Sequence, residues 1–167
     1  MVDADAFERF FMRWEPQVRR YLLWLEGDRS IIDDATQEAM LAAHTYWARI
    51  NTFRKPEAWL FKVASQRLHR VQAARQRHGL STDPSELPHG HGTDDVGLRE
   101  KELVLLEAVR KLPAQQRTAI ALRWQLDLPN DQIAVIMGVS ENSVKTHLRR
   151  GRSTLETVLA DVSGGER

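Results

Sequence analysis

Apolar side chains recur every three or four residues along most of this 167-residue chain, and no stretch of any length alternates apolar with polar residues. The first spacing is that of a helix with one face toward a core, whereas alternation would indicate a half-buried strand. Three helices are expected in the first half, over about residues 7–25, 32–50 and 57–78. Pro16 should divide or kink the first of them, and Pro56 suits the first turn of the third. The sequence therefore predicts an all-α fold.

The helical spacing stops over residues 79–97, where glycine, proline and acidic residues gather and lysine and arginine are absent. This composition is typical of a flexible linker. The second half should begin with a helix that ends before Pro113 and continue with one that turns Ile120 and Trp124 inward. We therefore expect two small helical domains joined by an acidic linker: residues 1–78, the linker at 79–102, residues 103–160, and a tail at 161–167.

Charge is distributed unevenly, although the formal net charge is only +1. Acids outnumber bases over residues 3–38, and bases occur without any acid over residues 62–78 and 145–152. Such separate blocks indicate surfaces with different partners, because a patch of one sign attracts ligands of the other. The alternative is that long helices simply present charged faces to water.

What the sequence lacks disfavours several kinds of function. It contains no cysteine, which excludes disulfides, thiol catalysis and Cys-based zinc sites. No run of about 18 apolar residues occurs, so no membrane insertion is expected, and the acids in the first ten residues do not suit a secretion signal. His89 and His91 flank Gly90, but two histidines without further ligands are weak evidence for a metal. We expect no catalytic residue, no metal, no cofactor, and a cytoplasmic location.

The clearest motif lies near the C-terminus, over residues 131–150. A short apolar helix ends at Gly138, where a left-handed residue is needed, and Ser140 can cap the helix that follows. Val144 and Leu148 are four residues apart and should face the domain. This is the pattern of a helix-turn-helix, whose second helix enters the major groove of DNA. A plain helical hairpin with a basic outer face is the alternative.

Residues 112–159 resemble region 4 of the extracytoplasmic-function sigma factors, the smallest group of the bacterial sigma-70 family. The first half is similar to region 2 of the same family through Asp33 to Glu38 (DDATQE) and Trp59 to Ala64 (WLFKVA). The likeness to region 4 rests on Leu112-Pro113, Arg117, Leu122-Arg123, Ile133-Ala134, Gly138-Val139-Ser140 and Val144-Lys145. The resemblance implies a non-enzymatic RNA polymerase sigma factor that binds core polymerase and directs promoter-specific transcription initiation. It also implies a region 2 helical bundle, a region 4 helix-turn-helix, and an anti-sigma protein as a candidate partner.

The resemblance further implies three sets of contact residues. Core polymerase would contact an acidic and polar face formed by Asp33, Asp34, Gln37 and Glu38. The melted strand of the −10 element would meet a base-capturing loop and a row of polar and basic residues: Phe53, Arg54, Lys55, Lys62, Gln66, Arg67 and Arg70. The −35 duplex would lie against Asn142, Ser143, Lys145, Thr146, Arg149, Arg150 and Arg152, since asparagine pairs with adenine and arginines hold phosphates.

Alternatives remain for each of these sets. The acidic face is either a polymerase contact, a solvated helix face, or a metal pair made by Asp34 and Glu38. Trp59 belongs either to the −10 site or to the core. The acidic linker either threads a basic channel of the polymerase or is a solvated tether. The whole chain is alternatively a helix-turn-helix regulator of another class, a sigma-like decoy that binds polymerase without promoter activity, or an enzyme of nucleic-acid metabolism.

The sequence departs from the family pattern at three places. Gln66 and Arg70 stand where the family commonly has an asparagine and, four residues later, an aspartate, which removes the usual −10 contacts or shifts their sequence preference. Ala35-Thr36 replaces a Leu-Val pair and thins the local packing. Pro129 stands where a serine usually precedes the helix-turn-helix, so Asn130 is expected to cap that helix instead.

Overall fold

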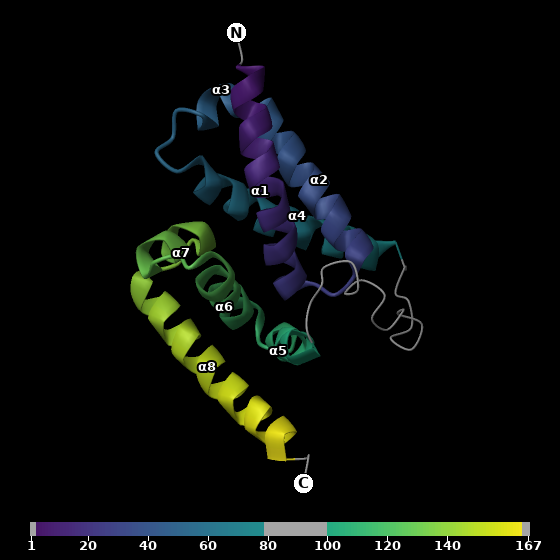
Figure 1. Ribbon diagram of the computed structural model, residues 1–167, viewed down its shortest axis with the longest axis vertical. Helices are drawn as coiled ribbons and strands as arrows, with labels where there is room; N and C mark the ends of the chain where they lie inside the picture. Colours follow the sequence, from purple (N-terminus) through teal and green to yellow (C-terminus); the bar gives the residue numbers. More distant parts are fainter. Residues whose placement is uncertain (1–2, 79–99, 165–167) are drawn as a thin grey trace. The chain divides into compact units, whose positions relative to one another are not determined.

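The computed structural model describes residues 3–78 and 100–164, in two compact units divided between His91 and Gly92. Eight helices and no strand occur among the described residues, which confirms the predicted all-α class (Figure 1). Most of the predicted linker, including both of its histidines, lies outside these ranges.

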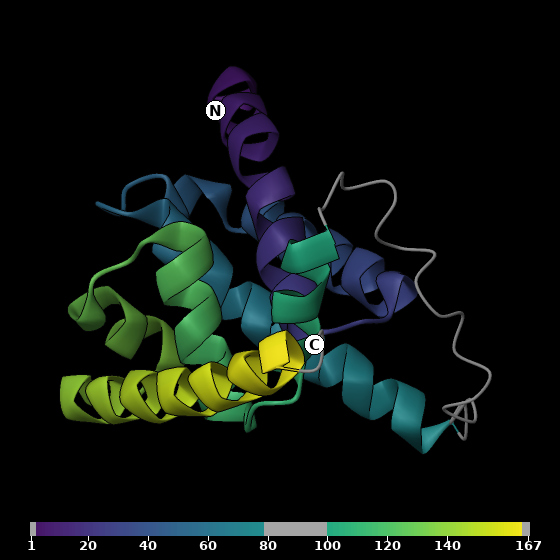
Figure 2. The ribbon, with the colours of Figure 1, turned by 60° about the horizontal axis from the view of Figure 1, so that its bottom comes forward.

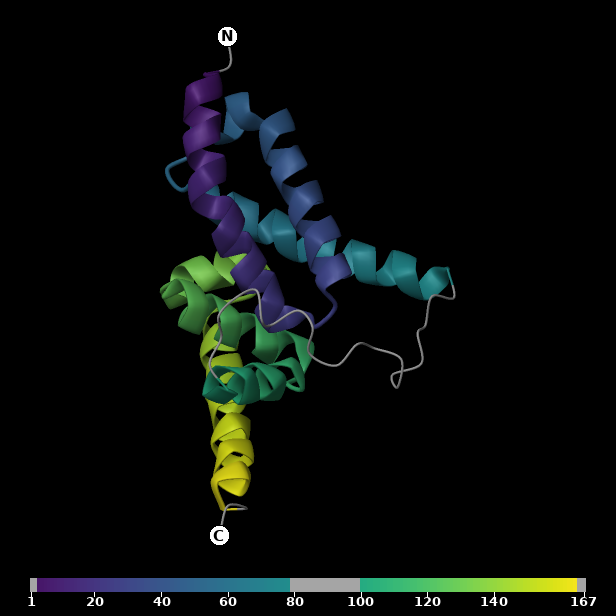
Figure 3. The same ribbon diagram turned by 45° about the vertical axis from the view of Figure 1, so that its right-hand side comes forward.

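The first unit consists of α1 (Ala4–Leu25), α2 (Arg29–Thr45), α3 (Trp47–Ile50) and α4 (Pro56–Arg77). α1 and α2 run side by side, and α4 crosses them (Figure 3). The apolar faces expected from the periodicity meet between these three helices, because each can leave water only by covering another. The core of the unit includes Val18, Tyr21, Leu22, Ala35, Ala39, Leu60, Phe61 and Leu68, together with Trp47 of α3.

Two helix boundaries in the first unit differ from the expectations. Pro16 lies inside α1 and does not divide it, because burial of Phe10 before it and of Val18 after it outweighs one missing backbone hydrogen bond. The helix expected over residues 32–50 is broken at Tyr46. Trp47 then packs against Phe10, with ring centroids 5.0 Å apart and ring planes inclined by 46°, so tertiary packing directs α3 away from α2.

A partly buried hydrogen-bonded pair joins α1 to α4. The Tyr21 hydroxyl lies 2.7 Å from Ser65 Oγ, and Ser65 donates its own proton to the Phe61 carbonyl at 2.9 Å. Because that proton is committed, Tyr21 is the donor to Ser65. Complete burial raises the pKa of the Tyr21 phenol by more than the Ser65 hydrogen bond lowers it. The phenol therefore stays neutral and keeps its donor role.

The second unit consists of α5 (Glu100–Arg110), α6 (Ala114–Leu126), α7 (Asn130–Met137) and α8 (Glu141–Gly164), with α6 and α7 packed along α8 (Figure 2). Helix α5 begins three residues before the expected domain boundary, and α8 continues into the expected tail. Ile120 is buried as expected, but Trp124 is 38% exposed. The inward orientation expected for Trp124 is therefore wrong.

Close packing at Gly151 fixes α8 against α6. Gly151 is buried in the middle of α8, and a Cβ built there would lie 3.0 Å from Cγ1 of Ile120. A glycine inside a helix costs about 1 kcal/mol relative to alanine. Here the missing side chain allows the two helices to approach each other.

Candidate functional site

The turn between α7 and α8 has the geometry of a helix-turn-helix. Gly138 adopts a left-handed conformation with φ +69°, which ends α7 as the sequence indicates. The Ser140 hydroxyl accepts a hydrogen bond from the Ser143 backbone N–H at 3.1 Å and so caps α8. Val144 and Leu148 are buried against the rest of the unit. The opposite face of α8 is thereby held outward.

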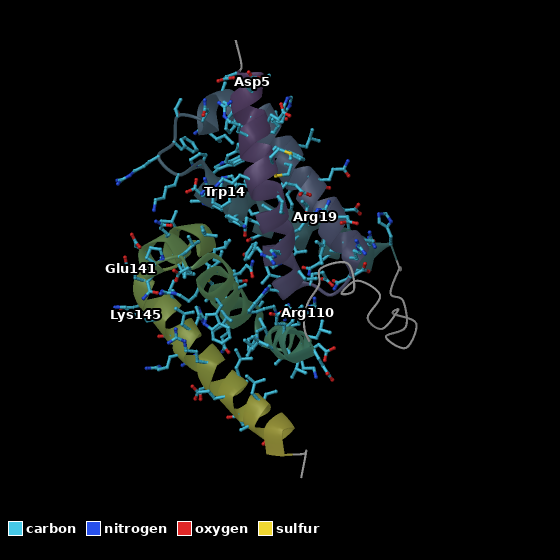
Figure 4. The ribbon with its side chains drawn as sticks, viewed as in Figure 1. Asp5, Trp14, Arg19, Arg110, Glu141 and Lys145 are labelled. Carbon is cyan, nitrogen blue, oxygen red and sulfur yellow. The ribbon has the colours of Figure 1, made fainter. Side chains whose placement is uncertain are left out.

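The outward face of α8 carries the predicted −35 residues. Asn142, Lys145 and the arginines that follow are exposed, and Figure 4 shows Lys145 on the side of α8 away from α6. Ser143 and Thr146 are half-buried; the Ser143 side chain bonds to Ser140, and the Thr146 hydroxyl donates to the Asn142 carbonyl. In the described ranges no carboxylate forms an ion pair with any of the four cations of this face: Lys145, Arg149, Arg150 and Arg152.

A cleft beside this face contains a cation that the sequence analysis missed. The cleft is lined by Arg123 of α6, Asn130 of α7, and cations of α8 that include Lys145 and Arg149. Arg123 donates to Asn130 Oδ1, while its Nε is buried without a hydrogen-bond partner in the described structure. From the sequence, Arg123 is identified only as half of the Leu122-Arg123 motif of region 4. Its place beside α8 depends on how three helices pack.

The bond to Arg123 corrects the capping assignment of Asn130. Asn130 is the first residue of α7, and its side-chain oxygen is directed to Arg123. Pro129 occupies the N-cap position without a side-chain hydrogen bond. The expectation that Asn130 caps α7 is therefore wrong, because a tertiary partner takes the oxygen that a cap would use.

The adjacent acids at the start of α2 point toward different helices. Asp33 pairs with Arg19 of α1, which also pairs with Glu15 (Figure 4 labels Arg19). Partial burial acts to lower the pKa of Arg19, but the hydrogen bonds and charges of its two carboxylate partners outweigh burial and raise it. Asp34 instead accepts from Arg75 of α4, with 3.0 Å between Oδ2 and Nη2. The predicted polymerase set is thus divided between two sides of α2.

The remaining members of that set lie in a groove between α2 and α4. Gln37 and Glu38 are exposed and line the groove together with Asp34. Leu41, which is 64% exposed, and Arg70 continue the groove toward the end of α2. The structure therefore places Arg70, predicted for −10 DNA, beside the predicted polymerase contacts.

The other predicted −10 residues lie on α4 and on the loop before it. Phe53, Arg54 and Lys55 are exposed in the loop between α3 and α4. Lys62 and Gln66 are exposed one turn apart on α4. Arg67 is half-buried and, with Arg70, lines the edge of α4 nearest to α2. Trp59 is also half-buried, with its ring 6.3 Å from that of Tyr46.

Comparisons with known proteins match both units. The profile of the family described as "Sigma-70 region 2" matches residues 10–78, and that of "Sigma-70, region 4" matches residues 102–155. The ECF RNA polymerase sigma factor SigL of Mycobacterium tuberculosis is 32% identical, over 86% of this chain and 82% of its own length. The chain belongs to the extracytoplasmic-function sigma factors of the sigma-70 family. Its function is that of an RNA polymerase sigma factor.

Further relatives support this sigma factor's fold. The ECF RNA polymerase sigma factor BldN of Streptomyces coelicolor is 31% identical over 95% of the chain, which spans 62% of the length of BldN. The solved structure of the sigma factor RpoE with the anti-sigma factor NepR, from Bartonella quintana, is similar over 94% of this chain and 98% of RpoE, with a TM-score of 0.72 and 20% identity. All predicted contact residues lie within the two matched ranges.

Two kinds of feature are absent from residues 3–78 and 100–164. Among them, no helix is long and apolar enough to cross a membrane. Nor does that part of the chain bring together three side chains of the His, Cys, Asp or Glu type in a group that could hold a metal ion.

Proposed function

We propose that this sigma factor binds core RNA polymerase through α2, reads the −35 element with α8, and holds the melted −10 strand against α4 and the loop before it. The observation that carries the proposal is the outward face of α8. Its cations have no acidic partner among the described residues, on a helix whose orientation is set by the Gly138 turn. A helix of this kind fits the major groove, where arginine and lysine meet phosphates and base edges.

At the −35 element, the residues on the first turns of α8 contact base edges and those that follow hold the backbone. Asn142 and Lys145 are exposed near the start of the helix, where a recognition helix meets bases. Ser143 and Thr146 contribute from the same turns, although part of their hydrogen-bonding capacity is used within the chain. Phosphates are held by Arg149, Arg150 and Arg152, and Arg123 joins this group from α6.

At the polymerase, the groove face of α2 is the contact surface. Asp34, Gln37 and Glu38 line one groove, and Leu41 adds an exposed apolar side chain beside them. Acidic and polar groups around an apolar centre suit a basic helical partner, because the charges steer the encounter and fix the register. Asp33 lies on the α1 side, at the edge of this surface.

At the −10 element, exposed cations near the start of α4 meet a single strand. Phe53 offers a ring for an unstacked base, and Arg54, Lys55 and Lys62 supply positive charge for the backbone. Gln66 follows one turn after Lys62 and is placed to contact the same strand. This assignment makes the chain a regulator that acts in the cytoplasm with the polymerase and has no catalytic step of its own.

One further partner and one alternative function are each supported by a specific observation. The RpoE structure contains an anti-sigma factor, so we propose that a protein of that class also binds this chain. A decoy that binds polymerase without promoter activity is the second candidate function. It is favoured by Arg70, which stands where the family usually has an aspartate and lines the α2 groove.

Reconstitution with core polymerase tests the proposal. Core polymerase plus the full chain should give promoter-specific run-off transcripts from a genomic promoter library. Replacing Asp34 and Glu38 together by lysine should abolish these transcripts by preventing holoenzyme assembly, since like charges then face the basic partner. Assembly without transcripts from any promoter would favour the decoy, and unchanged assembly by the double variant would refute the α2 contact.

A further inference from the structure

A guanidinium of the chain itself occupies part of the proposed polymerase contact. Arg75, near the end of α4, lies with Nη2 3.0 Å from Asp34 Oδ2 and with Nη1 3.9 Å from Asp28 Oδ2. The Asp34 side chain is 54% exposed and that of Arg75 is 30% exposed. The pair therefore lies at the surface of the groove, where a partner can reach it.

The geometry makes Arg75 and a polymerase cation compete for one carboxylate. Both Arg75 and Asp34 line the groove that also contains Gln37 and Glu38. A lysine or arginine that approached Asp34 from this groove would come close to the Arg75 guanidinium and be repelled by it. Such a cation binds Asp34 fully only after Arg75 has moved.

Asp28 gives Arg75 a second position when it leaves Asp34. The Asp28 side chain caps α2, accepting a hydrogen bond from the Ser30 N–H at 2.9 Å, so its carboxylate is fixed beside Arg75. A guanidinium that moves from one carboxylate to a neighbouring one loses little interaction free energy. The exchange therefore lowers polymerase affinity without preventing binding.

We propose that Arg75 is a positioning residue that sets the affinity for core polymerase, by holding Asp34 in the free chain and releasing it on binding. The proposal rests on the proposed polymerase contact of α2. It assigns Arg75 to regulation of that contact, although the sequence places it in a basic stretch that suits DNA. Removing Arg75 should tighten binding, whereas a residue that merely supports the fold would weaken it.

The expected gain in polymerase affinity, and its dependence on salt, follow from the exposure of the Arg75–Asp34 ion pair. Exposed ion pairs contribute little, so Arg75→Gln should tighten binding by about two- to fivefold at low salt. The gain should disappear as salt rises, because screening weakens the pair that is removed and the pair that is gained. Arg75→Lys keeps the cation and should bind within about twofold of the original chain.

Arg77 provides a matched control. It lies two residues further along α4, lines the same groove and forms no ion pair with Asp28 or Asp34. Arg77→Gln removes the same charge and so reports the general repulsion between α4 and a basic partner. Arg75→Gln should tighten binding clearly more than Arg77→Gln does.

Fluorescence anisotropy of the labelled full chain, titrated with core RNA polymerase, measures these affinities at low and high salt. In an Asp34→Asn background, Arg75→Gln should give no further gain over Arg77→Gln. Unchanged or weaker binding by Arg75→Gln, or a gain no larger than that of Arg77→Gln, would overturn the competition. Full affinity of Asp34→Asn alone would instead refute the polymerase contact on which the proposal rests, so the two failures are distinguishable.

Discussion

Helices α4 and α8 carry the two basic stretches of this sigma factor, yet their surroundings differ. On α4, Arg75 is paired with two acids near the start of α2. On α8, the cations from Lys145 to Arg152 have no ion pair with any described residue. Similar composition therefore gives one helix whose charge is partly used within the unit and one whose charge is available to a ligand.

Both helices pack through buried apolar side chains, but they differ in the contacts that add to this packing. α4 is joined to its neighbours by polar contacts, among them Tyr21 to Ser65 and Gln72 to Glu26, the latter at 2.5 Å. α8 is fixed by apolar contact, with Gly151 against Ile120 and with Leu155 buried. Polar contacts between helices can be exchanged for contacts with a partner, whereas close apolar packing holds a recognition helix at one angle.

The largest effect should come from the free cations of α8. Replacing Arg149 and Arg150 together by alanine should weaken holoenzyme binding to a −35 duplex roughly tenfold or more, because two phosphate contacts are lost. The slope of log affinity against log salt should fall by about 0.9 for each contact. Binding measured over a salt series tests both numbers.

Lys111 offers a control for this prediction. It is an exposed cation of the second unit outside α8, and Lys111→Ala should leave both affinity and slope almost unchanged. Equal effects of the two replacements would show that α8 attracts DNA only through the overall charge of the unit.

The packing of α8 should respond strongly to one added side chain. Gly151→Val places branched carbons against Ile120, where even a Cβ would lie at 3.0 Å. Overpacking of this kind should lower the free energy of unfolding of the second unit by about 1–3 kcal/mol. Urea denaturation measures the loss, and Thr154→Val, at an exposed position of the same helix, supplies the control. Equal stability of both variants would show that α8 does not depend on this close approach.

The polar attachment of α4 should contribute less. Tyr21→Phe removes the hydrogen bond to Ser65 and should lower the free energy of unfolding of the first unit by about 1 kcal/mol. The original chain should also lose stability as pH rises through about 10, the ordinary pKa of tyrosine, because the unfolded phenol then releases its proton while the folded one keeps it.

Alkaline urea denaturation separates these two effects. The difference in free energy of unfolding between the original chain and the Tyr21→Phe variant should narrow above pH 10, since the variant has no phenol at this position to ionise. A constant difference across that range would contradict the assignment of the raised pKa to Tyr21.

The sequence predicts the helices well because their apolar spacing is local information. Gly138 and Ser140 are equally local, and both were found at the turn as expected. The errors concern residues whose surroundings come from elsewhere in the chain. Asn130 bonds to Arg123 of another helix, and Trp47 leaves the line of α2 because it packs on Phe10.

The candidate site shows even more clearly that contacts between distant parts of the chain cannot be predicted from local sequence. The sequence can assign Arg75 to a basic stretch and Asp34 to an acidic one, but their separation of 41 positions along the chain hides their contact. Likewise, Arg123 joins the cations of α8 only because α6 packs along that helix. Charge patterns identify which residues are available, and tertiary structure decides which of them remain free.

The smallest changes in stability and in polymerase affinity should come from replacing Asp33, the neighbour of Asp34. Asp33 pairs with Arg19 on the α1 side, with both side chains close to half exposed, so Asp33→Asn should change the free energy of unfolding by only about 0.2–1 kcal/mol. The Asp33→Asn variant should also bind polymerase with an affinity within about twofold of that of the original chain. Asp34→Asn should weaken polymerase binding more, because Asp34 lines the groove and Asp33 does not. Parallel anisotropy titrations compare the two variants. If Asp33→Asn weakened binding as much as Asp34→Asn, the polymerase contact would extend around α2 to the α1 side, and the pair with Arg19 would have to open on binding as the pair with Arg75 does.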